Sequence, residues 1–205
     1  MKKTASLIFA SLILLLCLFG CNATEQLKEK LNARITRGTI NGNVYQSDFT
    51  GITFTKPDHW RYLTDEEIAE AVNIGKEALE VNAFENTVLE YSSVYDMAVI
   101  NEKTAQNLIV GYENISLTFG KSISEEEYYE FLKEGLEGSG FESTNEMEYV
   151  LLSGEDYLKV SFLGVSNGVE IENTSYLRLV GDIMTFITVT TPVGLINRNI
   201  EGMFS

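Results

Sequence analysis

Residues 142–191 read ESTNEMEYVLLSGEDYLKVSFLGVSNGVEIENTSYLRLVGDIMTFITVTT. Apolar residues alternate with polar ones along this stretch, and short turn signals interrupt it at Gly154, Asn167-Gly168 and Gly181-Asp182. Such turns join neighbouring antiparallel strands in tight hairpins. The stretch therefore predicts an antiparallel meander of four strands, at Glu142–Leu152, Asp156–Gly164, Val169–Val180 and Ile183–Thr191.

The preceding residues add shorter strands and two capped helices. Thr64 with Glu67, and Ser124 with Glu127, each place a capping residue three positions before a glutamate, which predicts helix starts. Because hairpin-linked strands need helices to cover them, we expect an α+β domain over residues 41–205, with an antiparallel sheet of six or more strands and two or three helices. The further segments are strands near Val44-Tyr45, at Ile52–Thr55, Asp96–Asn101 and Asn107–Leu117, and a closing amphipathic helix with Ile196, Ile200, Met203 and Phe204.

The N-terminus has the pattern of a secretory signal. Met1-Lys2-Lys3 is basic, and residues 5–20 are uncharged and mainly apolar. This run is shorter than the ~20 residues that a membrane-spanning helix needs, and the polar residues after Cys21 do not extend it. Residues 1–20 are therefore predicted to be a signal peptide, and a retained anchor helix is the weaker alternative.

The end of that run, Leu18-Phe19-Gly20-Cys21, resembles the lipobox of bacterial lipoproteins, although Phe19 stands where a smaller residue is commoner. The resemblance implies that the Cys21 sulfur carries a diacylglycerol and that the chain is cut just before Cys21. The protein would then be held on the outer face of the cell membrane by its lipid. A cysteine that ends the signal by chance is the alternative reading.

Residues 21–40 are predicted to be a tether between the anchor and the domain. Leu27, Leu31 and Ile35 recur at spacings of four, which gives a narrow apolar stripe. A helix this short is marginal in water unless it packs on the domain. The tether is therefore expected to be partly helical at most.

The chain is strongly acidic, with a formal net charge of −15. Removal of Lys2 and Lys3 with the signal lowers this charge by two, to −17. Nucleic-acid binding requires a basic surface, so a nucleic-acid partner is not expected. The acidity favours solubility through self-repulsion, and an acidic face that binds cations remains an alternative.

Residues 51–60, Gly-Ile-Thr-Phe-Thr-Lys-Pro-Asp-His-Trp, resemble the signature of small Firmicutes lipoproteins of the PsbP/Mog1-like group. The Pro57-x-x-Trp60 spacing carries most of this resemblance. It implies an antiparallel sheet flanked by helices, and the known members have accessory roles without catalysis. No residue that those members use toward their partners is matched here.

Catalytic and metal-binding motifs are sparse. His59 is the only histidine and precedes Trp60 in a predicted loop, and the chain has no Gly-x-Ser-x-Gly turn. Zinc coordination by histidine and cysteine needs more such residues than the chain provides. We therefore expect no catalytic residue, no metal and no cofactor.

Carboxylates are plentiful, and two clusters of them stand at predicted helix starts. Acidic residues are favoured there by the helix dipole, so a structural role is the first interpretation and an oxygen-ligand calcium site is the second. A pair of carboxylates acting as a cell-wall glycan hydrolase also stays open. The clusters are Asp65, Glu66, Glu67 and Glu70, and Glu125, Glu126 and Glu127.

Trp60 is the only tryptophan and has two interpretations. It either packs over the end of a strand or forms an exposed aromatic platform for a sugar or peptide. The tyrosines could add an aromatic surface, although most stand at positions compatible with a core: Tyr91, Tyr95, Tyr112, Tyr128, Tyr129 and Tyr149.

These features favour a membrane-anchored, non-catalytic binding or accessory module that acts outside the cytoplasm on an unknown envelope protein or ligand. The alternative is a carboxylate-dependent cell-wall hydrolase.

Overall fold

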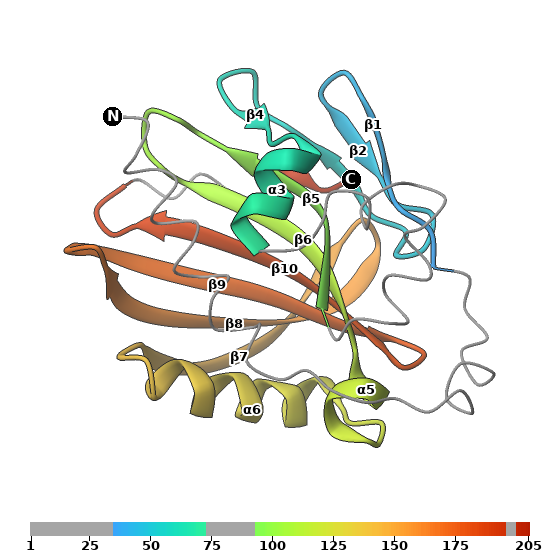
Figure 1. Cartoon of the computed structure of the whole chain (residues 1–205), viewed down its shortest axis with the longest axis vertical. Helices are drawn as coiled ribbons and strands as arrows, with labels where there is room; N and C mark the ends of the chain where they lie inside the picture. The colour runs from blue at the N-terminus through green and yellow to red at the C-terminus, as the bar shows by residue number, and fades with distance from the viewer. Residues whose placement is uncertain (1–34, 73–92, 196–199) are drawn as a thin grey trace.

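The structure is a computed structural model that describes residues 35–72, 93–195 and 200–205. Seven antiparallel strands form the main sheet in the order β4-β5-β6-β10-β9-β8-β7, and β1-β2-β3 form a smaller antiparallel sheet (Figure 1). The strands are β1 (Thr39–Asn41), β2 (Val44–Gln46), β3 (Thr53–Thr55), β4 (Arg61–Tyr62), β5 (Ser93–Ile100), β6 (Asn107–Asn114), β7 (Glu142–Leu152), β8 (Glu155–Ser166), β9 (Val169–Val180) and β10 (Ile183–Pro192).

The helices of the described residues lie beside the main sheet. Helix α3 packs on β5, and α6 packs along β7, β8 and β9 (Figure 1). The predicted α+β class, with an antiparallel sheet of at least six strands and flanking helices, is confirmed. The helices are α3 (Asp65–Val72), α5 (Ile115–Phe119), α6 (Glu125–Glu137) and the 3-10 turn η3 (Glu201–Met203).

The predicted meander is present, and local turn chemistry explains it. Ser153 and Gly154 both have positive φ, as do Asn167 and Gly168, which is the backbone of a type I′ turn. These turns join β7 to β8 and β8 to β9 with two residues each. Strands β7 and β9 have the predicted bounds, whereas β8 and β10 extend slightly beyond them.

Both predicted capping boxes form. The Ser124 hydroxyl accepts from the Glu127 amide at 3.2 Å, and the Glu127 carboxylate accepts from the Ser124 amide at 3.0 Å. Thr64 and Glu67 exchange the same two bonds at the start of α3. Each helix therefore begins where its local sequence dictates.

The end of the predicted strand Asn107–Leu117 is a correction. Strand β6 stops at Asn114, and Ile115–Phe119 form the short helix α5. The Asn114 side chain caps this helix by accepting from the Leu117 amide at 3.3 Å, and Gly120 ends it with φ of 67°. The cap thus overrides the apolar strand-like composition.

The predicted closing helix is a second correction. Ile196 lies outside the described residues, and the described end contains only the 3-10 turn before Phe204. Phe204 is extended and forms a β-bridge with Phe54 of β3, their ring centroids 5.3 Å apart. Because this pairing needs extended backbone, the chain end adds to the small sheet instead of forming an amphipathic helix.

The first residue that the structure describes, Ile35, already belongs to the core. Ile35 is 1% exposed, and β1 starts at Thr39, so the expected tether boundary at residue 40 falls inside a strand. The predicted signal, Cys21 and most of the predicted tether lie outside the described residues. The apolar spacing after Thr64 predicts that the first helix continues to Leu79, and residues 73–79 also lie outside them. No helix within 35–72, 93–195 or 200–205 is long and apolar enough to span a membrane.

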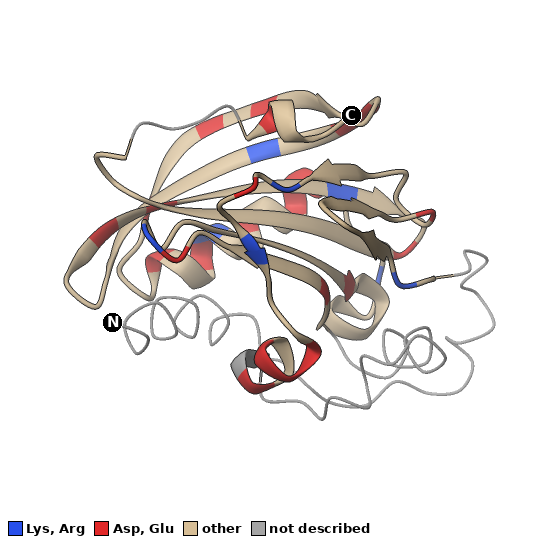
Figure 2. Ribbon diagram, turned by 90° about the horizontal axis from the view of Figure 1, so that it is seen from above, with Lys and Arg blue, Asp and Glu red and all other residues tan. Residues whose placement is uncertain are grey.

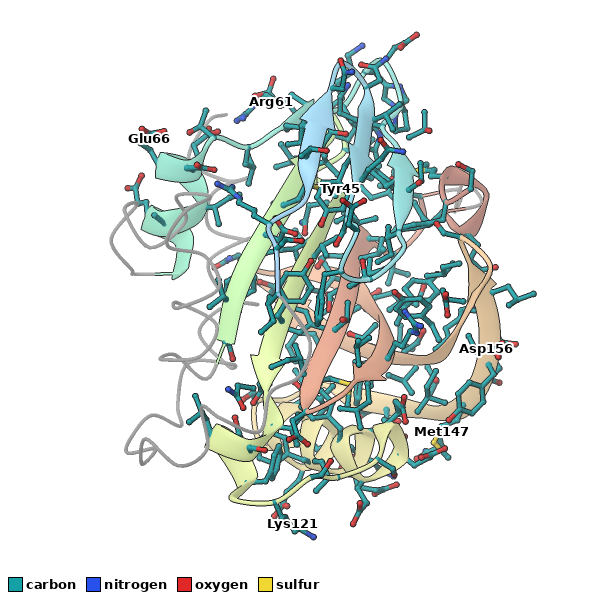
Figure 3. The ribbon with its side chains drawn as sticks, turned by 90° about the vertical axis from the view of Figure 1, so that its right-hand side faces the viewer. Tyr45, Arg61, Glu66, Lys121, Met147 and Asp156 are labelled. Atoms are coloured by element: carbon teal, nitrogen blue, oxygen red, sulfur yellow. The ribbon has the colours of Figure 1, made fainter. Side chains whose placement is uncertain are left out.

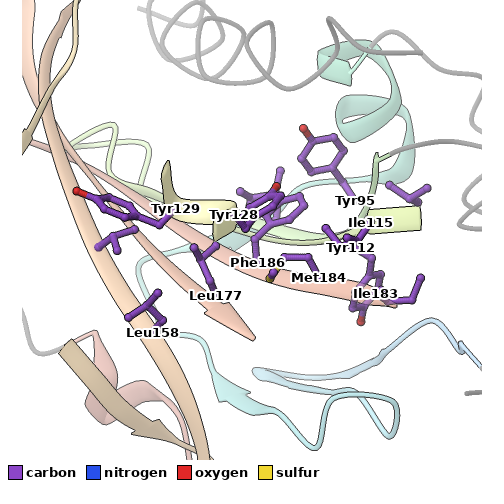
Figure 4. Packing of buried hydrophobic residues seen from close by; sticks show 14 of the residues in the cluster. Tyr95, Tyr112, Ile115, Tyr128, Tyr129, Leu158, Leu177, Ile183, Met184 and Phe186 are labelled. Carbon is purple, nitrogen blue, oxygen red and sulfur yellow. The ribbon is translucent and has the colours of Figure 1, made fainter. Parts of the chain in front are cut away.

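The core has two layers; the second lies on one face of the main sheet, and the first lies mainly on the other face but includes Tyr112 and Ile183, which alternation places on the face of the second. Figure 4 shows the first layer, in which Tyr128 and Tyr129 of α6 lie near Leu177 and Phe186. The second layer lies on the opposite face and contains aromatic residues of the small sheet and the chain end: Tyr45, Phe54, Trp60 and Phe204. The sheet is therefore buried on both faces over its central strands, and only its margins remain for contact with other molecules.

Candidate binding surface

Trp60 belongs to the second core layer. It is 3% exposed, and its amide donates to the Pro57 carbonyl at 3.0 Å while its own carbonyl accepts from Lys56 Nζ at 2.7 Å. The tryptophan therefore closes a tight loop over the sheet and presents no exposed platform. His59 is exposed in the same loop.

Most of the candidate tyrosines also lie in the core. Tyr95, Tyr112, Tyr128 and Tyr129 are at most 3% exposed, and Tyr91 lies outside the described residues. Tyr149 differs, because 55% of it is exposed. The aromatic surface that the sequence suggested is thus reduced to one tyrosine on β7, among the residues that the structure describes.

The first acidic cluster is engaged in ion pairs and a helix cap. Asp65 accepts from the Arg37 guanidinium at 2.8 Å, and Glu67 accepts from Arg61 at 2.8 Å. The hydrogen bond from Arg37 lowers the pKa of Asp65, and that from Arg61 lowers the pKa of Glu67. These carboxylates are therefore committed to structural contacts.

The second cluster has similar uses. Glu125 accepts from the Leu179 amide at 2.9 Å, Glu126 accepts from the Tyr149 hydroxyl at 2.6 Å, and Glu127 closes the capping box. In the described part of the chain, no three histidine, cysteine or carboxylate side chains come together in a metal-binding arrangement.

Asp96 is the most buried carboxylate of the described residues. It sits where the register between β5 and β6 shifts, between Tyr95 and Met97, so it is the extra residue of a bulge. Its carboxylate accepts from the Tyr45 hydroxyl at 2.6 Å and from the Tyr112 hydroxyl at 2.8 Å. The bulge thus turns an acidic side chain toward the small sheet.

The Asp96 carboxylate also binds Arg37 and Gly38, near the start of the described residues. The Gly38 amide donates to it at 3.0 Å, and Arg37 Nε lies 3.5 Å from Asp96 Oδ1. Burial nevertheless dominates and raises the pKa of Asp96, because the hydrogen bonds and Arg37 offset only part of the desolvation. Asp96 therefore links Arg37 and Gly38 to β5, and the Asp96 side chain has no solvent access.

Glu113 is the second carboxylate whose pKa is raised by burial. It follows Tyr112 along β6, so its side chain points to the opposite face of the sheet from the Asp96 cluster. There it accepts from the Tyr128 hydroxyl of α6 and from the Thr118 hydroxyl at 2.7 Å. Asp96 and Glu113 are therefore both buried and separated by the sheet, which does not fit the facing carboxylates of a glycan hydrolase.

The exposed apolar residues of β7 form a distinct surface. Met147, Tyr149 and Leu151 alternate along the strand and therefore share one face, and they are 49%, 55% and 67% exposed. They pair with Val160, Leu158 and Asp156 of β8, of which Val160 and Leu158 belong to the core layer under α6. This β7 edge surface (Met147, Tyr149 and Leu151) is thus an apolar continuation of the core to the margin of the sheet.

Strand β7 is also an open edge. It is the last strand of the main sheet, and no described strand pairs with its outer side. Its pairing with β8 is irregular between Ser143 and Met147 and regular from Met147 to Leu152. The regular part leaves unpaired backbone donors and acceptors beside exposed apolar side chains, a combination that folded proteins usually avoid. Figure 3 shows Met147 and Asp156 at the outer margin of the molecule.

The surroundings of this surface are acidic. The hydrogen bond to Glu126 and the nearby charges of Glu125 and Asp156 raise the pKa of Tyr149 to about 12. The neighbouring lysines are already engaged, Lys159 with Glu148 at 2.8 Å and Lys133 with Asn145 at 2.8 Å. Figure 2 shows the wider pattern, with acidic positions in red over the helices and strand ends.

Comparison with known proteins shows remote structural resemblance only. No family model matches the chain, and no curated protein is similar to it in sequence. Cyanobacterial PsbP (CyanoP) from Synechocystis is 14% identical, with a TM-score of 0.43 over 86% of this chain and 87% of that one. The Ran-binding protein Mog1p of Saccharomyces cerevisiae is 15% identical, with a TM-score of 0.40 over 76% and 79%.

A protein from Bacteroides thetaiotaomicron is 13% identical, with a TM-score of 0.39 over 78% of this chain and 42% of that one. The solved structures that resemble this chain thus include PsbP and Mog1, the two members that name the group suggested by residues 51–60. All three TM-scores are below 0.5, so these resemblances assign no ligand, partner or activity to the chain.

Proposed function

We propose that the protein is a lipid-anchored binding module on the outer face of the cell membrane, which holds an envelope protein through the β7 edge surface. The observation that carries the proposal is the exposed run of Met147, Tyr149 and Leu151 on an open strand edge. Exposed apolar residues gathered at one place on a folded domain are typical of interaction sites, and open edges are used to bind extended segments.

The described residues offer no competing catalytic arrangement that favours the hydrolase alternative. The carboxyl groups with raised pKa are Asp96 and Glu113, each buried and on a different face of the sheet. At the helix starts, Asp65 and Glu67 are bound by arginines, and Glu125 accepts from a backbone amide. Binding without turnover is therefore the function that these residues support best.

The anchor is tested on protein isolated from membranes. Mass spectrometry of the N-terminal peptide is expected to show a mature chain that begins at Cys21 and carries two acyl chains, which together give stable retention. Cys21→Ser is expected to leave the membrane fraction or to accumulate uncut. An unmodified N-terminus at any other residue of the wild-type protein would contradict the anchor.

The binding role is tested by affinity capture of the intact lipoprotein with two matched variants. Leu151→Lys places a charge in the β7 edge surface, and Val165→Lys places the same charge at an equally exposed apolar position on β8. Capture of an envelope protein is expected to be lost with Leu151→Lys and kept with Val165→Lys. Equal capture by both variants, or turnover of peptidoglycan fragments by the purified protein, would contradict the proposal.

A further inference from the structure

We infer that the partner segment at the β7 edge surface is an extended strand with alternating basic and apolar residues, which pairs with the backbone of β7 as an eighth strand of the main sheet. This inference rests on the proposed function and specifies its partner. It follows from three properties of the edge: its length, its apolar row and its charge.

The length of regular edge sets the size of the added strand. Met147 to Leu152 pair with β8 without interruption, so the opposite side of the same six residues is available for an antiparallel or parallel partner. Six residues span ~20 Å of strand. The irregular stretch from Ser143 to Met147, with Asn145 at φ of 59°, limits the pairing at the other end. The partner strand is thus about six or seven residues long.

The apolar row of β7 determines that every second residue of the partner strand is apolar. Met147, Tyr149 and Leu151 project from one face, so a strand added beside β7 places its own alternate side chains next to them. Apolar side chains at those positions would cover these three side chains, which are now 49% to 67% exposed. Hydrogen bonds to the β7 backbone supply affinity, and this row supplies register.

The acidic side chains near the β7 edge surface determine that the remaining residues of the partner strand are basic. Glu142, Glu146 and Asp156 are exposed at this margin and form no ion pair with a described residue, and Glu126 accepts only neutral donors. Of the nearby cations, Lys159 lies between Glu148 and Glu201, and Lys133 donates to the Asn145 side-chain oxygen. The remaining residues of the partner point to the other face of the sheet, where Glu146 forms no ion pair with a described residue and Glu148 shares Lys159 with Glu201. A lysine or arginine at these positions would therefore meet unbalanced carboxylates.

A second copy of the chain fits this edge less well. Pairing β7 with another β7 would bring the carboxylates of Glu146 and Asp156 of both copies to one margin, in molecules that each carry a net charge of −15. Like charges across strands oppose pairing. The acidic margin therefore favours a basic partner of a different sequence over self-association.

The experiment titrates the full chain, kept in detergent micelles, with three fluorescent heptapeptides. The first peptide, Lys-Val-Lys-Val-Lys-Val-Lys, is expected to bind, and its affinity should weaken as salt is added. Replacement of its lysines by glutamates removes the charge match, and replacement of its central valine by proline removes a backbone donor and disrupts the strand. Both altered peptides are expected to bind at least tenfold more weakly.

Two protein variants locate the site. Leu151→Lys is expected to weaken binding of the lysine peptide at least tenfold, whereas Val165→Lys should leave it unchanged. Hydrogen exchange gives a readout that needs no variant, because the amides within Met147–Leu152 that point away from β8 should become protected when the peptide is added. Equal binding by both variants, equal binding of the proline peptide, or unchanged exchange in β7 would each overturn the inference.

The outcome separates this inference from the proposed function. If the envelope partner is lost with Leu151→Lys but no lysine peptide binds, the binding module stands and the basic strand is wrong. If sedimentation shows a dimer that Leu151→Lys abolishes, a second copy occupies the edge and the inference is likewise wrong. If neither the envelope protein nor the peptide depends on Leu151, both proposals fail.

Discussion

Thr190 buries a hydroxyl that has no hydrogen-bond partner in the part of the chain that the structure describes. Asn107 and Asn173 flank it in register on β6 and β9, and the Asn107 side-chain oxygen Oδ1 and both polar atoms of the Asn173 side chain also have no partner among the described residues. All three residues are at most 1% exposed. Because buried polar groups without partners are costly, this row is a local weakness of the sheet.

A pair of isosteric substitutions tests that weakness. Thr190→Val removes an unpartnered hydroxyl, so we expect the free energy of unfolding to rise by about 1 kcal/mol. Thr188 lies two residues earlier on the same face, and its hydroxyl forms a hydrogen bond with Ser175 at 3.0 Å. Thr188→Val removes this bond and should lower the free energy of unfolding by about 1 kcal/mol. Urea unfolding of the two variants measures both changes. A loss of stability in Thr190→Val would show that its hydroxyl has a partner.

Glu113 makes the stability depend on pH. Burial raises the pKa of Glu113 above its usual 4.5, so the folded protein keeps this proton to a higher pH than the unfolded chain does. The stabilisation is present below about pH 4.5 and is lost as the pH rises through the folded pKa. In Glu113→Gln this titration is absent, so the wild type should lose stability relative to the variant as the pH rises above about 4.5.

Glu67→Gln serves as the control with the opposite sign. Arg61 lowers the pKa of Glu67, so the wild-type carboxylate contributes stability above the unfolded pKa and loses it as the pH falls. Urea unfolding on both sides of the usual glutamate pKa of 4.5 should therefore show the two differences running in opposite directions, the Glu67 difference below that pH and the Glu113 difference above it. A Glu113→Gln difference that did not change with pH would contradict the raised pKa.

At the scale of elements, α6 depends on its N-terminal cap. Ser124→Ala removes the acceptor for the Glu127 amide, and we expect a loss of about 1 kcal/mol in the free energy of unfolding. Ser122→Ala changes an exposed serine just before the cap and should alter stability by less than about 0.5 kcal/mol. Thermal unfolding compares the two variants. Equal midpoints for Ser124→Ala and Ser122→Ala would show that the cap does not limit the stability of α6.

The elements that sequence reasoning predicted well are those specified by local chemistry. Ser153-Gly154 and Asn167-Gly168 have residues that tolerate positive φ, so the hairpins were visible in the sequence. Helix α5 was missed because five residues are too short for a periodic signal, and its apolar content suggests a strand. The local signals that could have revealed it are the capping residue Asn114 and the glycine at position 120 that ends it.

The candidate surface could be predicted only in part. Alternation along 147–151 places Met147, Tyr149 and Leu151 on one face, which the sequence shows. Whether a helix covers that face depends on where α6 lies on the sheet, and this is set by packing between distant residues. The Asp96 cluster was missed for a similar reason, because Arg37 and Gly38 meet Asp96 across nearly sixty residues at a bulge without a sequence signal.

At the scale of the whole molecule, the main sheet has two different edges. The strand β4 at one edge has two residues, whereas β7 at the other has eleven and carries the exposed apolar row. Short edge strands offer little backbone for pairing with another chain, whereas long apolar edge strands pair with other chains readily. The net charge of −15 keeps copies of the chain apart. Together these features favour one docking edge that accepts a different molecule.

Site-specific photo-crosslinking in intact cells tests this account most directly. A photoreactive amino acid replaces Leu151 in one variant and Val165 in another, both in the full chain that includes Cys21. We predict a crosslinked envelope protein at position 151 and none at position 165. A crosslink of equal yield at both positions, or none at position 151 while one forms at position 165, would contradict binding through β7.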